Sequence, residues 1–159
     1  MFFIDIKVKP YVKQYLINEF GNRVYFDSEA KYYSTFLSLL SKGCKSLNFH
    51  EVDEKDIVRI HYSEDVFYRH GFSMSKSHMM MLNNAIEQDV KFIMRTHIGC
   101  MAVLGYSIAE SIRHFQTKVN FGEDVWPFES IKKDIDRNTD TKKENFVDDF
   151  LKQYSIRLS

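Results

Sequence analysis

A helical pattern of apolar residues runs through the middle of the chain, from Ser75 to about Leu104. Apolar side chains recur there at steps of three or four, the spacing of one face of an α-helix. This face is formed by Leu82, Ile86, Val90, Ile93, His97, Met101 and Leu104. The segment predicts a long amphipathic helix, which Gly99 can bend or divide.

Two segments of the N-terminal half alternate between apolar and polar residues, as half-buried strands do. Residues 2–8 place Ile4, Ile6 and Val8 on one side, and residues 57–62 place Val58, Ile60 and Tyr62 on one side. Short strands are also expected at Val24-Tyr25-Phe26 and at Val66-Phe67-Tyr68. The latter would pair with residues 57–62 as a hairpin across Ser63-Glu64-Asp65.

Helical spacing fills the remainder of the N-terminal half. One helix is predicted to open at Pro10 and to stop at Gly21. A second is predicted to have Ser28 as its N-cap and to close at Gly43. The fold class expected is α+β, with a small antiparallel sheet packed on helices and a mostly helical C-terminal half.

The chain has 159 residues, 44% hydrophobic and 28% charged, which indicates one domain over residues 1–159. Within it we expect a mixed α/β half at 1–72, a helical half at 73–138 and an amphipathic tail at 139–159. The tail carries Phe146, Val147, Phe150, Leu151 and Tyr154 on one side of a helix. That apolar side either packs on the same domain or pairs two subunits in a homodimer.

Several classes of protein are excluded by what the sequence lacks. No apolar run approaches the roughly 20 residues of a membrane span, and the N-terminus does not resemble a signal peptide. With only Cys44 and Cys100, no disulfide framework is expected, and a cytoplasmic location follows. No nucleotide-binding, metalloprotease or hydrolase motif is present, so we expect no enzyme activity, no cofactor and no metal. An acidic cluster at 51–56 is interpreted as a solvated loop, although paired carboxylates also occur in metal-dependent nucleases.

The segment 107–137 carries the main functional signal. Ser107 followed by Glu110 is a capping box, which predicts a helix from Ile108 to about Lys118. Asn120-Phe121-Gly122 forms a short turn, and a second helix begins at Pro127. Two amphipathic helices joined by a short glycine-containing turn are the plan of a helix-turn-helix.

In that motif the second helix presents base-reading side chains to the major groove. Here the face opposite Ile131 and Ile135 presents Ser130, Lys133 and Arg137. Lysine and arginine read guanine edges there. The cations expected to hold phosphates are Lys118, Lys132 and Arg113. The sequence thus predicts binding of double-stranded DNA without catalysis.

The charge balance favours a different class. Lysine plus arginine equals aspartate plus glutamate at 22 each, whereas proteins held to DNA by bulk electrostatics are usually basic. The charged residues of the second helix then form a salt-bridged, solvated surface. The alternative is a protein-interaction or assembly module, such as a phage accessory or structural component.

The stretches 112–115 and 123–134 resemble the C-terminal end of small proteins carried by prophages and mobile elements of anaerobic gut bacteria. A vaguer similarity covers residues 15–21. Those proteins are of similar length and are presumed to be DNA-associated or regulatory. The resemblance implies a transcriptional or replication regulator of a mobile element, and it brings no catalytic residues.

Overall fold

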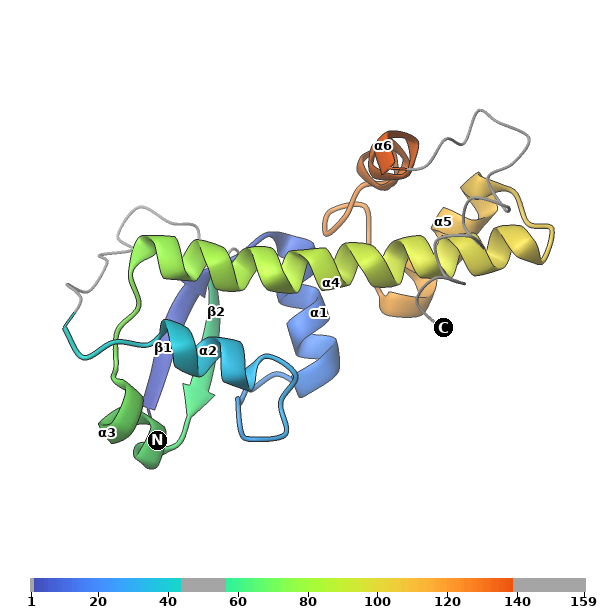
Figure 1. The fold of residues 1–159 in the computed structure, drawn as a ribbon. Helices are drawn as coiled ribbons and strands as arrows, with labels where there is room; N and C mark the ends of the chain where they lie inside the picture. The colour runs from blue at the N-terminus through green and yellow to red at the C-terminus, as the bar shows by residue number, and fades with distance from the viewer. Residues whose placement is uncertain (1, 44–56, 139–159) are drawn as a thin grey trace, which may run out of the picture. The chain divides into compact units, whose positions relative to one another are not determined.

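The computed structural model describes residues 2–43 and 57–138 (Figure 1). They form two antiparallel strands and six helices, and the described part of the C-terminal half is mostly helical, which confirms the predicted α+β class. The chain packs as two compact units, one ending at Val90 and one beginning at Lys91. Helix α4 (Lys76–Val103) contributes residues to both units.

The two strands that the alternation predicts are present as β1 (Phe2–Lys7) and β2 (Ile57–Tyr62), and they pair with each other in the sheet of the first unit. The strands run antiparallel, with Phe2 opposite Tyr62 and Lys7 opposite Ile57. One face is buried, through Ile4, Ile6, Val58 and Ile60. On the other face Arg59 pairs with Asp5 across the strands, with 2.8 Å between Nε and Oδ1. This register therefore buries the apolar side chains on one face of the sheet and, on the other face, places Arg59 opposite Asp5.

The short strand predicted at Val24-Tyr25-Phe26 is reduced to a single bridge between Tyr25 and His61. The Phe26 amide donates to the His61 carbonyl at 2.9 Å, and the His61 amide donates to the Val24 carbonyl at 2.8 Å. This segment follows the edge of β2 for one pair of hydrogen bonds only.

The predicted strand at Val66-Phe67-Tyr68 is wrong, because these residues lie in helix α3 (Glu64–His70). Ser63 caps the helix by accepting a hydrogen bond from the Val66 amide at 3.3 Å. Acidic residues occupy its first turn and basic residues its last turn, which suits the helix dipole at both ends. In this short segment the capping signal outweighs the β-propensity of its aromatic and branched residues.

Helix α1 (Pro10–Phe20) begins and ends as predicted, whereas α2 (Tyr33–Leu39) begins later than predicted and ends before the predicted stop at Gly43. Ser28 is not its N-cap. Instead Asp27 Oδ1 accepts from the amides of Glu29 and Ala30, at 3.0 and 3.1 Å, and holds the chain in a turn. An aspartate one residue earlier thus diverts the segment from helix formation.

The core of the first unit joins the sheet to its helices. Phe36 contacts Phe26 and Tyr62, with ring centroids 5.4 Å apart in each pair. Glu87 on α4 is buried and accepts hydrogen bonds from Lys9 Nζ at 2.8 Å and Tyr11 Oη at 2.9 Å. This carboxylate fixes the start of α1 against α4.

Helix α4 runs unbroken through Gly99, so the predicted division there is wrong (Figure 1). Its buried face follows a strict four-residue step through Leu82, Ile86, Val90, Met94 and Ile98. Ile93 and Leu104, predicted on this face, are 37% and 72% exposed. Among the described residues, no helix combines the length and the apolar character of a membrane-spanning segment.

The second unit adds α5 (Ile108–Val119) and α6 (Phe128–Asn138) to the end of α4. Both helices are present as predicted, but the connection between them covers residues 120–127 and is longer than the predicted turn. The core of this unit includes Ile112, Phe115, Trp126, Ile131 and Ile135, all of them buried.

Candidate functional site: the α5–α6 helix pair

The start of α5 has the capping box that the sequence predicts. Ser107 Oγ accepts from the Glu110 amide at 3.3 Å, and Glu110 Oε2 accepts from the Ser107 amide at 2.9 Å. Hydrogen bonds from the Ser107 side chain and backbone hold the pKa of Glu110 below its usual value. At the other end, Asn120 adopts the left-handed conformation at φ 55° and terminates the helix.

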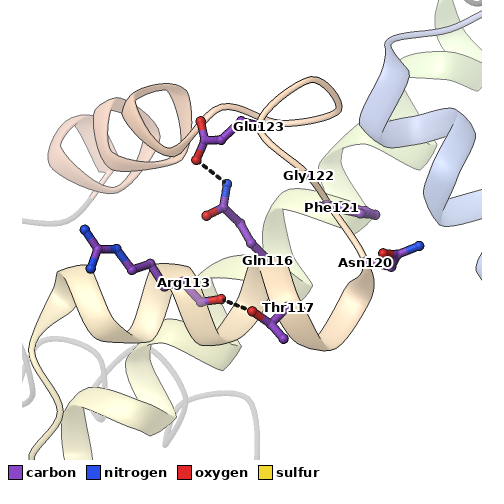
Figure 2. Close-up of a pocket in the computed structure, with 7 residues that line it drawn as sticks. All are labelled: Arg113, Gln116, Thr117, Asn120, Phe121, Gly122 and Glu123. Atoms are coloured by element: carbon purple, nitrogen blue, oxygen red, sulfur yellow. Dashed lines mark hydrogen bonds between the residues drawn. The ribbon is translucent and has the colours of Figure 1, made fainter.

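The connection from α5 to α6 is held by two side chains. Gln116 Nε2 donates to the Trp126 carbonyl at 2.8 Å and to Glu123 Oε1 at 3.2 Å. Glu123 Oε2 accepts from the amide of Phe128, the first residue of α6, at 3.0 Å. Figure 2 shows Gln116 and Glu123 pointing toward one another. Glu123 thus caps α6 and ties it to α5.

Three aromatic side chains lie beneath this connection. Phe115 of α5 meets Phe121 and Trp126 at ring-centroid distances of 5.8 and 6.3 Å. Trp126 is 3% exposed, so it belongs to the core of this unit. The aromatic cluster and the polar bonds above it together fix the geometry of the helix pair.

A shallow pocket of about 470 Å³ opens beside the connection (Figure 2). Its lining consists of Arg113, Gln116, Thr117, Asn120, Phe121, Gly122 and Glu123. The guanidinium of Arg113 lies 5.8 Å from the centre of the Phe128 ring, so this cation is held against the start of α6. The amide of Asn120 lies at the opposite end of the pocket.

The inward face of α6 carries one acidic residue beside Ile131 and Ile135. Both Nε and Nη2 of Arg95 lie 2.7 Å from Oδ1 of Asp134, and Lys91 Nζ lies 3.8 Å from its Oδ2. The Asp134 side chain is only 14% exposed. Its negative charge is therefore compensated by α4.

The outward face of α6 carries the predicted base-reading residues. Ser130, Lys133 and Arg137 are exposed, and Lys133 and Arg137 lie one turn apart. Lys132 is exposed toward one flank. Within residues 2–43 and 57–138, none of these three cations forms an ion pair. The exposed acidic residues of the same helix are Glu129 and Asp136, which make its outward surface mixed in charge.

The two predicted phosphate contacts on α5 lie apart from each other. Arg113 lies against α6 through the Phe128 ring. Lys118 is exposed near the C-terminal end of α5, and its charge acts on His97 of α4. Of the six predicted residues, four therefore lie exposed on α6, Arg113 lies against the start of that helix, and Lys118 lies near the C-terminal end of α5.

The structure brings together two histidines that the sequence gives no reason to pair. His97 Nε2 of α4 lies 2.9 Å from His114 Nδ1 of α5. His97 is half-buried and His114 is exposed. Burial, the neighbouring His114 and Lys118 all lower its pKa. No spacing rule relates two residues on different helices, so the sequence holds no signal for this contact.

Neither a search for metal-binding side chains nor a comparison with known proteins adds a candidate site. In the part of the chain that the structure describes, no three histidine, cysteine, aspartate or glutamate side chains gather as a metal site would require. No protein-family model, curated protein or solved structure matches this chain.

Proposed function

We propose that this protein binds double-stranded DNA through the outward face of α6 and has no catalytic activity. The observation that carries the proposal is the division of charge on that helix. Asp134 turns inward to Arg95 and Lys91, while Lys133 and Arg137 remain exposed and unpaired among the described residues. Exposed cations on a helix are attracted by the negative charge of the DNA phosphates that flank a groove.

Each exposed residue of α6 has a role in this proposal. Lys133 and Arg137 would contact guanine edges, and Ser130 would bond to either kind of base. Lys132 would contact a phosphate on the flank, with Arg113 and Lys118 contacting the backbone from α5. Glu129 would accept from a cytosine amino group, so the mixed surface suits selective binding better than strong non-specific binding.

The rigid connection supports the same proposal. Gln116, Glu123 and the buried aromatic cluster fix α6 relative to α5 before any ligand arrives. A surface that is already ordered loses less conformational entropy on binding. The connection is nevertheless longer than the three or four residues usual in a helix-turn-helix, so only the exposed helix is carried over from that motif.

The biological setting that we propose is regulation of transcription or replication for a prophage or mobile element, in the cytoplasm. It rests on the resemblance of residues 112–115 and 123–134 to proteins of such elements. A homodimer formed through the tail would suit palindromic sites, but residues 139–159 lie outside the described part of the chain.

Fluorescence anisotropy with labelled duplexes selected from a random-sequence pool tests the proposal. The wild type is expected to bind more weakly as salt increases. The Lys133→Ala/Arg137→Ala variant should lose at least about tenfold in affinity, since each base contact contributes about 1–3 kcal/mol, while its melting temperature stays unchanged. A Lys7→Ala/Lys76→Ala variant removes two exposed cations from the first unit and serves as the matched control. No salt-sensitive binding by the wild type at low ionic strength would end the proposal.

A second candidate, a protein-assembly module, is favoured by an exposed apolar corner. Val103, Leu104 and Tyr106 at the α4–α5 junction are 46%, 72% and 50% exposed. Apolar surface of this kind is often covered by a partner. Light scattering across a concentration series should show a mass that increases for the wild type and not for Leu104→Lys. A constant monomer mass in both proteins would argue against assembly through this corner.

A further inference from the structure

We propose that His97 and His114 form a proton-controlled latch, which fastens α5 to α4 at neutral pH and releases it when both rings are protonated. The proposal goes beyond DNA binding and does not depend on it. Both histidines belong to the second unit, and they are 17 positions apart in the chain.

The relative placement of the rings defines the bond. Their planes differ by 13° and their centroids are 5.1 Å apart, while Nε2 of His97 and Nδ1 of His114 are 2.9 Å apart. The centroid distance is close to the nitrogen separation plus the two ring radii. The rings therefore lie edge to edge in nearly one plane, and each nitrogen faces the other along the direction of a straight N–H···N bond.

Three protonation states follow from this geometry. In the neutral pair one facing nitrogen carries the hydrogen and the other accepts it. A first added proton goes to the outer nitrogen of the donor ring, so the facing bond persists and gains charge assistance. A second proton can only go to the accepting nitrogen. Two N–H groups then face one another across 2.9 Å, and two positive rings repel.

The surrounding charges oppose that second proton. Lys118 on α5 adds another positive charge near His97. The acidic groups of the neighbouring elements are bonded elsewhere: Glu110 to Ser107, Asp134 to Arg95, and Glu123 to Gln116 and Phe128. In the described part of the chain, none of these carboxylates is hydrogen-bonded to either ring.

The direction of the pH effect follows from linkage. The pKa of His97 is lowered in the folded protein, so the folded chain binds fewer protons than the unfolded chain in weak acid. The latch stabilises the second unit fully above the ordinary histidine pKa of about 6.5. Its contribution decreases as pH falls below that value and through the lowered pKa of His97.

A proton fits this position better than a metal ion. Bonds from zinc to histidine nitrogen are about 2.0–2.1 Å, so an ion placed between edge-to-edge rings would separate the nitrogens by about 4 Å. The separation here is 2.9 Å. The two facing nitrogens are therefore placed for a hydrogen bond and not for metal coordination.

Nitrogen-15 NMR of the full chain reads the latch directly. As pH is lowered from 8 to 4.5 with a chelator present, the two imidazoles should protonate in two separate steps, the second well below the ordinary histidine pKa of about 6.5. The tautomers should show one facing nitrogen protonated and one bare at pH 8. A single step for both rings near that ordinary pKa would overturn the proposal.

Unfolding in urea gives an independent readout, because the single tryptophan, Trp126, lies in the second unit. The unfolding midpoint should fall from pH 7.5 to pH 5.0. In the His97→Gln/His114→Asn variant, whose amides cannot titrate, that fall should be at least halved, whereas His70→Gln should retain it. An undiminished fall in the double variant would overturn the latch. If the double variant does not fold at pH 7.5, the NMR titration of the wild type decides alone.

Discussion

Oδ1 of Asp134 on α6 lies 2.7 Å from both Nε and Nη2 of Arg95 on α4. Lys91 approaches the other oxygen of the same carboxylate at 3.8 Å. The contact holds α6 in place, and it also takes a negative charge away from the side of the helix where Lys133 and Arg137 are exposed. Stability and the proposed DNA binding thus depend on one carboxylate.

Replacing Asp134 by asparagine should therefore destabilise the second unit. The asparagine oxygen can still accept a hydrogen bond from Arg95, but the partly buried counter-charge is gone, and a charge-assisted hydrogen bond contributes about 1 kcal/mol more than a neutral one. Urea unfolding followed by Trp126 fluorescence measures the loss. Glu129→Gln removes an exposed charge from the same helix and should cost less than about 0.5 kcal/mol. Equal effects from both variants would contradict this role for Asp134.

The Glu123 side chain, as the cap of α6, should contribute about 1 kcal/mol to the free energy of unfolding. Glu123→Ala leaves the Phe128 amide without its acceptor and Gln116 with one acceptor fewer, and loss of a helix cap costs about 0.5–2 kcal/mol. Glu123→Gln keeps an amide oxygen that can accept, so it should recover part of the loss. Hydrogen exchange at the Phe128 amide reports the cap, and the exposed neighbour Asp124→Ala is the control. Unchanged exchange in Glu123→Ala would refute the cap.

The capping box of α5 should make stability depend on pH in acid. Because the pKa of Glu110 is lowered in the folded protein, its contribution is complete above its ordinary value of about 4.5. That contribution is lost as pH falls through the lowered folded pKa. Thermal unfolding between pH 6 and pH 3 should show a smaller pH dependence for Glu110→Gln than for the wild type. Parallel curves would mean that the carboxylate does not contribute in this way.

Gly71 should tolerate no side chain. Its φ is +119°, and a Cβ there would lie 2.3 Å from the backbone carbon and oxygen of Ser41. Gly21 also has a positive φ, but a Cβ there meets nothing within 4 Å. Gly71→Ala should thus cost several kcal/mol and Gly21→Ala about 1 kcal/mol. Hydrogen exchange of the β1–β2 amides measures both, and similar costs would contradict the close approach.

Local signals in the sequence were sufficient for much of the fold. Three signals that act within a few residues are confirmed. They are the alternation at 57–62, the proline and the glycine at the two ends of α1, and the Ser107–Glu110 capping box. The errors arise where two local signals compete. Ser63 as a helix cap prevailed over the strand propensity of Val66-Phe67-Tyr68, and the turn at Asp27 prevailed over a cap at Ser28.

The candidate site required information that no local pattern carries. The exposure of Ser130, Lys133 and Arg137 follows from the period of α6. The inward ion pair of Asp134, the link from Gln116 to Glu123 and the contact of His97 with His114 join different elements. On α4, helical steps of three and of four fit the sequence equally well, and only packing selects Met94 in place of Ile93.

The uninterrupted course of α4 limits how this protein can be divided. The boundary between the two units falls within the helix, between Val90 and Lys91, and buried residues stand on both sides of it at Val90 and Met94. A peptide ending or starting there would lose helical hydrogen bonds and uncover part of a core. Cleaving the chain or inserting a fusion at this point should therefore destabilise both units. A substitution that unfolds the middle turns of α4 should likewise destabilise both of them.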